Sequence, residues 1–165
     1  MLDENSIAAG TRVLETVQKL PSGSHLMLLV SGGASALVEA PAEGLELGDL
    51  TTRAQQLLAS GADIHAMNAA RTEASRIKGG KLLGAFRGAR VTTLAISDVE
   101  GDSLQVIGSG IGAAPADPGF DFDARSVASN AIARAAVGRT ARQDGLDVGT
   151  DEETPIPYAQ LEVKL

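Results

Sequence analysis

Two serines and two glycines follow an apolar run near the start of the chain. In "LMLLVSGGASALVEA", residues 26–40, Ser31, Gly32, Gly33 and Ser35 stand between a strand-like run and a helix-compatible stretch. Glycine lets successive backbone N–H groups turn toward one point, and a helix beginning there adds the positive end of its dipole. The stretch therefore predicts an anion-binding loop, most simply for phosphate. A tight turn from strand to helix explains the same residues equally well, and the spacing matches neither GxGxxG nor GxxxxGK[ST].

Two further clusters carry charges that suit a phosphate ligand. "RIKGGKL" places Lys78 and Lys81 around a Gly-Gly pair, where cations would neutralise charge on a transferred phosphoryl group. "DVEGD" places Asp98 and Asp102 on one acidic turn, a spacing that allows both carboxylates to face one Mg²⁺. An exposed basic stretch and a solvated acidic loop are the ordinary alternatives for these two patterns.

The elements that must position these residues follow from apolar periodicity and turn residues. The pattern predicts helices over 5–19, 35–39, 50–58 and within 59–82, and from a Ser129/Asn130 cap to about 143. It predicts strands over 25–30, 90–97 and 126–128, with a further one beginning at 146–148, and a glycine-rich loop over 108–119. Both unusual turns directly follow strands, and ligands gather at the carboxyl ends of parallel strands.

Strands alternating with helices predict an α/β fold, a mostly parallel sheet with helices on both faces. The chain has 165 residues, enough for one domain, which we expect over residues 1–149, followed by an irregular tail over 150–165. Its core must come from small aliphatic residues, because aromatics make up only 2%.

Charge and composition exclude several classes of partner. A net charge of −7 disfavours nucleic acid and anionic membranes, and no apolar run approaches the ~20 residues of a membrane span. Cysteine is absent, which excludes disulfides and thiolate sites and is typical of a cytoplasmic protein. The N-terminal residues are acidic and polar and predict no secretory signal.

Four motifs in order resemble the N-terminal, Rossmann-like domain of the glycerate 2-kinase family, whose members are often labelled hydroxypyruvate reductase. They are "DENSIAAG", "LLVSGGASALVEAP", "LLASGADIHAMNAARTEASRIKGGKL" and "ISDVEGDSLQVIGSG", and a weaker match follows at "VASNAIARAA". The resemblance implies an ATP- and Mg²⁺-dependent kinase that converts D-glycerate to 2-phosphoglycerate in a cleft against a second domain.

The resemblance also implies roles for individual residues. The loop at Ser31, Gly32, Gly33 and Ser35 would hold phosphate or the substrate carboxylate, and the remaining roles fall on residues further along the chain. Those implied residues are Asn68 and Arg71 lining the cleft, Lys78 and Lys81 at the nucleotide phosphates, and Asp98 with Asp102 at the metal, with Lys78 and Arg71 as the catalytic pair.

The chain departs from the family pattern in ways that bear on activity. Thr72, Glu73 and Ala74 replace a basic, more apolar stretch, and "SDVEGDS" lacks one carboxylate and a proline. A preceding strand-helix unit with a functionally important lysine and a second domain are also missing from this sequence. We therefore expect a truncated relative that binds anions with doubtful turnover and that could self-associate as a homo-oligomer through an exposed edge or face. Hydroxypyruvate reduction with a nicotinamide cofactor and a non-catalytic anion-binding fragment are the alternatives.

Overall fold

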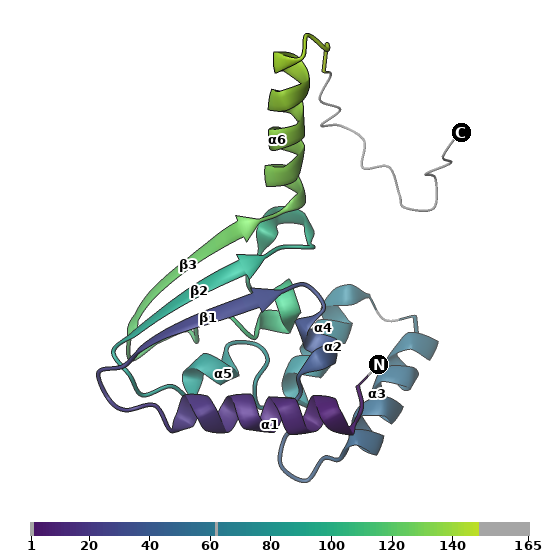
Figure 1. Ribbon diagram of the computed structural model, residues 1–165. Coiled ribbons are helices and arrows are strands. Elements are labelled where there is room, and N and C mark those ends of the chain that lie inside the picture. Colours follow the sequence, from purple (N-terminus) through teal and green to yellow (C-terminus); the bar gives the residue numbers. More distant parts are fainter. Residues whose placement is uncertain (1, 62, 149–165) are drawn as a thin grey trace. The chain divides into compact units, whose positions relative to one another are not determined.

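Three parallel strands organise the first of two separate units in this computed structural model (Figure 1). The structure describes residues 2–61 and 63–148, and it divides them between a unit ending at residue 130 and a unit beginning at residue 131. The strands are β1 (His25–Ser31), β2 (Arg90–Ile96) and β3 (Asp121–Ala128), in the spatial order β1-β2-β3. The predicted α/β fold with a parallel sheet is confirmed.

The register of the sheet brings the carboxyl ends of the strands to one edge. Ser31 of β1 pairs with Ile96 of β2, and Ile96 pairs with Ala128 of β3 after a register shift. The two turns singled out in the sequence therefore leave the sheet side by side, as the parallel arrangement requires.

In Figure 1, α1 and α5 lie beneath one face of this sheet, and α2, α3 and α4 group near the carboxyl end of β1. The helices of this unit are α1 (Glu4–Gln18), α2 (Ala34–Leu37), α3 (Leu47–Ala59), α4 (Ile64–Glu73) and α5 (Lys81–Gly84), with 3-10 turns η1 (Glu100–Asp102) and η2 (Ile107–Gly110). Helix α1 begins at an Asp3 cap, whose carboxylate accepts from the Ser6 amide at 2.8 Å.

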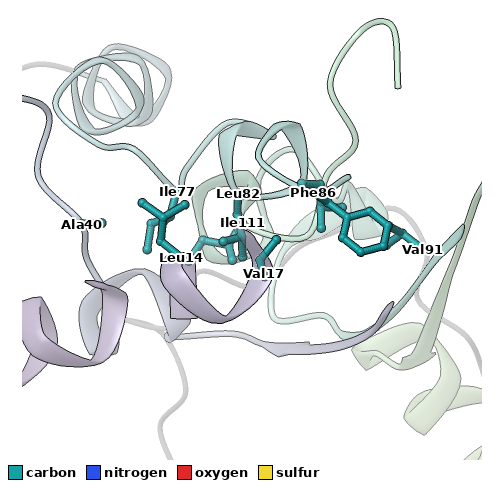
Figure 2. Packing of buried hydrophobic residues seen from close by; sticks show 9 residues of the cluster. Leu14, Val17, Ala40, Ile77, Leu82, Phe86, Val91 and Ile111 are labelled. Atoms are coloured by element: carbon teal, nitrogen blue, oxygen red, sulfur yellow. The ribbon is translucent and has the colours of Figure 1, made fainter. Parts of the chain in front are cut away.

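The main core lies between that helical layer and the sheet. Figure 2 shows side chains of α1, α5 and nearby segments packed together, with Val91 of β2 next to Phe86 at one end of the row. The buried members of this cluster are Leu14, Val17, Ala40, Ile77, Leu82, Leu83, Phe86, Val91 and Ile111. Phe86 packs edge-on against Phe120 with ring centroids 5.5 Å apart, so two of the few aromatic residues close the end of this core.

The opposite face of the sheet carries exposed apolar side chains. Leu29 is 74% exposed, and Met27, Ile96 and Val127 are each at least half exposed. Their neighbours Leu26, Leu28 and Val30 point to the covered face, as strand alternation requires. Within residues 2–130 the second helical layer that we expect from the sequence is therefore not found.

The described residues of the second unit form most of helix α6 (Asn130–Gln143), which ends before Gly145 as the sequence predicts. Three other predictions need correction. Helix α3 begins at Leu47 instead of Leu50, β3 begins at Asp121 instead of Ser126, and residues 146–148 form no strand. The expected tail over 150–165 lies outside the described residues.

Candidate phosphate-binding cavity

The glycine-serine loop joins the end of β1 to α2. Gly33 has a φ of +80° where α2 begins, a conformation that favours glycine. The Gly32 amide donates to the Ile96 carbonyl at 3.2 Å, so it belongs to the sheet. No described residue accepts a hydrogen bond from the amides of Gly33, Ala34 or Ser35. These three consecutive backbone donors, called the open donors below, have no hydrogen-bond partner among the described residues.

The loop borders a cavity of about 660 Å³ in the first unit. Six residues singled out in the sequence line it: Gly33, Ser35, Asn68, Arg71, Lys78 and Asp98. Four others do not: Ser31, Gly32, Lys81 and Asp102. A volume of this size lies within the range of small-molecule sites.

Lys78 is buried in the wall of this cavity. Its Nζ lies 2.6 Å from Oε2 of Glu39 and donates to the Ser35 carbonyl at 3.0 Å. Its side chain is 1% exposed. The charge predicted to meet phosphate is therefore already paired with a buried carboxylate.

Ser35 is also linked to Asn68 through Ser109, a residue that was not singled out in the sequence. The Oγ atoms of Ser35 and Ser109 are 2.9 Å apart, and Ser109 Oγ lies 3.5 Å from Oδ1 of Asn68. Ser109 is buried and has a φ of +58°, in the left-handed region that L-residues rarely adopt. Its place between two glycines in "GSG" was the available signal, because such flanks permit an unusual backbone.

Asp98 lies directly against the glycine-serine loop. A Cβ added at Gly32 would sit 2.1 Å from Oδ2 of Asp98, so a side chain at position 32 would displace this carboxylate. Asp98 lines the cavity, whereas Asp102 lies on η1 with a φ of +51° and does not. Among the described residues no group of three His, Cys, Asp or Glu side chains is arranged to hold a metal ion. Asp98 can supply one carboxylate ligand.

Lys81 has a local partner instead of facing the cavity. Its Nζ donates to the carbonyls of Thr72 at 2.5 Å and Ser75 at 2.8 Å, just where α4 ends. A cation at the C-terminus of a helix interacts favourably with its last carbonyls and with the negative end of its dipole. Lys81 thus caps α4.

Two arginines give the cavity its available positive charge. Arg53 of α3 and Arg71 of α4 line it, and neither forms an ion pair with any described residue. Because Glu39 neutralises Lys78, these two guanidiniums outnumber the remaining carboxylate of Asp98. The cavity is therefore locally positive in a protein of net charge −7. Arg53 was not singled out in the sequence, because it lies among the polar residues of α3.

Comparison with known proteins places these features in a family. Residues 1–142 match a family model described as "Domain of unknown function (DUF4147)". The chain is 43% identical over 108 residues to D-glycerate 2-kinase of Thermotoga maritima and 44% identical over 108 residues to a putative hydroxypyruvate reductase of Agrobacterium vitis. The chain belongs to the glycerate kinase and hydroxypyruvate reductase family.

The fold agrees with solved structures of similar proteins. A crystal structure of glycerate kinase from Thermotoga maritima matches with a TM-score of 0.76 at 28% identity, over 88% of this chain and 42% of that one. The two curated relatives are matched over 66% of this chain, which spans only 26% and 28% of their length. In the described part of this glycerate kinase family member, no helix has the length and apolarity needed to cross a membrane.

Proposed function

We propose that this chain forms part of the active site of an ATP-dependent kinase that phosphorylates D-glycerate to 2-phosphoglycerate. The observation that carries the proposal is the cavity lined by Gly33 and Ser35 of the glycine-serine loop, by the Asp98 carboxylate, and by two arginines that have no ion-pair partner among the described residues. Relatives named D-glycerate 2-kinase supply the substrate and the reaction. In that reaction the C2 hydroxyl oxygen forms a bond to the γ-phosphorus and its proton is released to solvent. The bond between the γ-phosphorus and the β,γ-bridging oxygen breaks, and ADP leaves with that oxygen.

In this proposal the residues that line the cavity have different roles, according to the charge and the polar groups that they carry. The amides after Gly33 would bind phosphate oxygens, and Arg53 and Arg71 would offset charge on the phosphoryl group. Asn68, whose Oδ1 faces Ser109, has its amide group available for an oxygen of the substrate. Such groups act by positioning and electrostatics, which carry most of phosphoryl transfer.

Asp98 fits Mg²⁺ for an electrostatic reason. A carboxylate beside an anion-binding loop repels the anion unless a cation lies between them. A bound Mg²⁺ would supply positive charge there that offsets the charge of the phosphate groups. We therefore assign Asp98 as the protein ligand of the ion, while Asp102, which lies outside the cavity, supplies no ligand in this proposal.

Calorimetry and a coupled assay test the proposal. The chain should bind ATP more tightly with Mg²⁺ than without it, and Arg71→Gln should weaken binding about ten- to hundredfold, as loss of a charge-assisted hydrogen bond does. Arg12→Gln, on exposed α1 outside the cavity, is the matched control. ATP binding that is absent, or equal in wild type and Arg71→Gln, contradicts the proposal.

Turnover is measured as ADP formation with D-glycerate, beside a full-length relative. Consumption of NADH with hydroxypyruvate, in place of ADP formation, would favour the reductase named among the relatives. ATP binding without turnover in this chain, with turnover in the relative, identifies the chain as a binding portion of the enzyme. A cytoplasmic location and homo-oligomer formation stay predictions from the sequence.

A further inference from the structure

Two buried polar residues beneath the glycine-serine loop have no role in the proposed phosphate binding. Glu39 is 2% exposed and Ser75 is 1% exposed, and both contact Lys78, which is equally buried. Burying charges and hydroxyls costs free energy unless every polar atom is paired. The described residues contain no buried side-chain nitrogen or oxygen without a partner, so this cluster is fully paired.

The contacts form a closed network, the Glu39–Ser75–Lys78 cluster. Oε1 of Glu39 accepts from Ser75 Oγ at 2.5 Å and from the Ala40 amide at 3.0 Å, while Oε2 pairs with Lys78 Nζ at 2.6 Å. Ser75 Oγ in turn accepts from the amides of Ile77 and Lys78, each at 3.2 Å. Glu39 and Ser75 thus fix both ends of the Lys78 residue, its backbone amide and its ammonium group.

The backbone of Glu39 is itself fixed by α1. Its amide donates to the Ser6 carbonyl at 3.0 Å. A Cβ added at Gly10 of α1 would lie 2.1 Å from the Glu39 carbonyl oxygen, so the helix and this backbone are in direct contact. The backbone of Glu39, which carries the cluster's carboxylate, is therefore supported by α1.

On the cavity side, Lys78 Nζ donates to the carbonyl of Ser35 at 3.0 Å. That carbonyl belongs to the residue whose hydroxyl contacts Ser109, and its amide is one of the three open donors. We propose that the Glu39–Ser75–Lys78 cluster holds the glycine-serine loop in its anion-binding conformation, with Lys78 acting as a positioning residue. The inference rests on the proposed phosphate binding and adds Glu39 and Ser75 to the residues on which it depends.

This arrangement differs from direct contact between Lys78 and phosphate in its consequence for Glu39. If Lys78 bound phosphate itself, removing the Glu39 charge would free the ammonium group and tighten ATP binding. If Lys78 positions the loop, the same change loosens the loop and weakens binding. Ser75 makes the comparison clearer, because it does not line the cavity and its hydroxyl bonds to Glu39 and to the amides of Ile77 and Lys78.

The test compares Glu39→Gln and Ser75→Ala with wild type in the full chain. Hydrogen exchange in the absence of ligand is the first readout, at the Ala36 and Val38 amides that bond within the loop and α2. We expect about tenfold faster exchange there, relative to the β2 amides, in both variants. The Kd for MgATP should rise about tenfold, as for a loop that is binding-competent in about a tenth of the molecules.

Glu15→Gln is the matched control, because it removes an exposed carboxylate that pairs with Lys19 on α1. It should change neither readout. Unchanged loop exchange in both variants, or tighter MgATP binding by Glu39→Gln, overturns the inference. If wild type binds no ATP, the proposed kinase function fails, while the exchange measurement still decides whether the cluster holds the loop.

Discussion

At the scale of single residues, the candidate site depends on close approaches that only glycine allows. Gly32 leaves room for the Asp98 carboxylate, and Gly10 leaves room for the backbone of Glu39. The two neighbours differ in how easily they can move. Asp98 meets Gly32 with the end of an exposed side chain, whereas Glu39 meets Gly10 with backbone that is bonded to Ser6.

We expect Gly10→Ala to lower the free energy of unfolding by about 2–4 kcal/mol, as other changes that displace packed backbone do. Thermal or urea unfolding followed by circular dichroism measures the change. Gly48→Ala in α3 is the control, because a Cβ there meets nothing within 4 Å. That change should be neutral or stabilise by up to about 1 kcal/mol, since alanine restricts the unfolded chain. Equal effects at the two positions would contradict the close contact.

The cap of α1 should make stability depend on pH. Hydrogen bonds from the Ser6 amide, and then from the Ser6 hydroxyl, lower the pKa of Asp3 from its usual 3.8. A lowered folded-state pKa contributes stability above the unfolded value and loses it as pH falls through the folded value. Asp3→Ala should therefore reduce the melting temperature near neutral pH, by a difference that shrinks as pH falls below 3.8.

The control for this prediction is Asp3→Asn, measured over the same pH range. Asparagine accepts the same hydrogen bond without titrating, so it should retain most of the stability of wild type. A difference between wild type and Asp3→Ala that stays constant with pH would show that the carboxylate does not contribute in this way.

Sequence reasoning found residues near the glycine loop but could not assign their pairings. Gly33, Ser35 and Asp98 follow strands directly, so parallel topology alone brings them together. Lys78 carries a charge in a basic stretch, and nothing local shows that Glu39, far away along the chain, neutralises it. Glu39 itself lies in an apolar run, and an acidic side chain is normally expected to be exposed to solvent. Such pairings depend on tertiary packing, which short-range spacing does not encode.

At the scale of elements, the sheet has one face that is covered by other parts of the chain and one face that is exposed to solvent. Predicting β1 was possible because its apolar run is continuous and bounded by turns, and predicting β2 was possible because it is rich in β-branched residues. The start of β3 was missed because "DFDARSVA" alternates charged residues with Phe122 and Ala124. That alternation is what a strand with one solvent-facing side requires, whereas strands covered by helices on both faces are expected to be apolar throughout.

Matched leucine substitutions test this difference between the two faces. Leu82 of α5 is completely buried beneath the sheet, and Leu29 of β1 is 74% exposed on the other side. Leu82→Ala should cost about 2–5 kcal/mol of unfolding free energy, the usual range for a buried leucine. Leu29→Ala should stay within about 0.5 kcal/mol, as at other exposed positions. Denaturant titration of both variants measures the contrast, and a large cost at Leu29 would show that this face is covered in solution.

At the scale of the whole molecule, the two units differ in what stabilises them. Every buried residue of both hydrophobic clusters falls within the first unit, the latest being Ile111. In the second unit the described helix exposes Ile132 and Val137. The first unit thus has the contacts needed to fold by itself.

A chain that ends at Asn130 should therefore retain the cooperative unfolding of the full chain. We expect its melting temperature to stay within a few degrees, measured by circular dichroism at equal protein concentration. The cavity and the Glu39–Ser75–Lys78 cluster lie entirely within these residues, so ATP affinity should also be retained. Loss of cooperative unfolding in the shortened chain would show that residues after 130 stabilise the first unit.

The solvent-exposed face of the sheet affects how the stability of the protein varies with temperature. Met27, Leu29, Ile96 and Val127 already contact water in the folded chain, so unfolding newly hydrates less apolar surface than in a sheet covered on both sides. The heat capacity of unfolding should then fall below the usual ~12–15 cal/mol/K per residue. A smaller heat capacity flattens the stability curve, so this protein should lose less stability on cooling than a fully covered α/β domain of similar size.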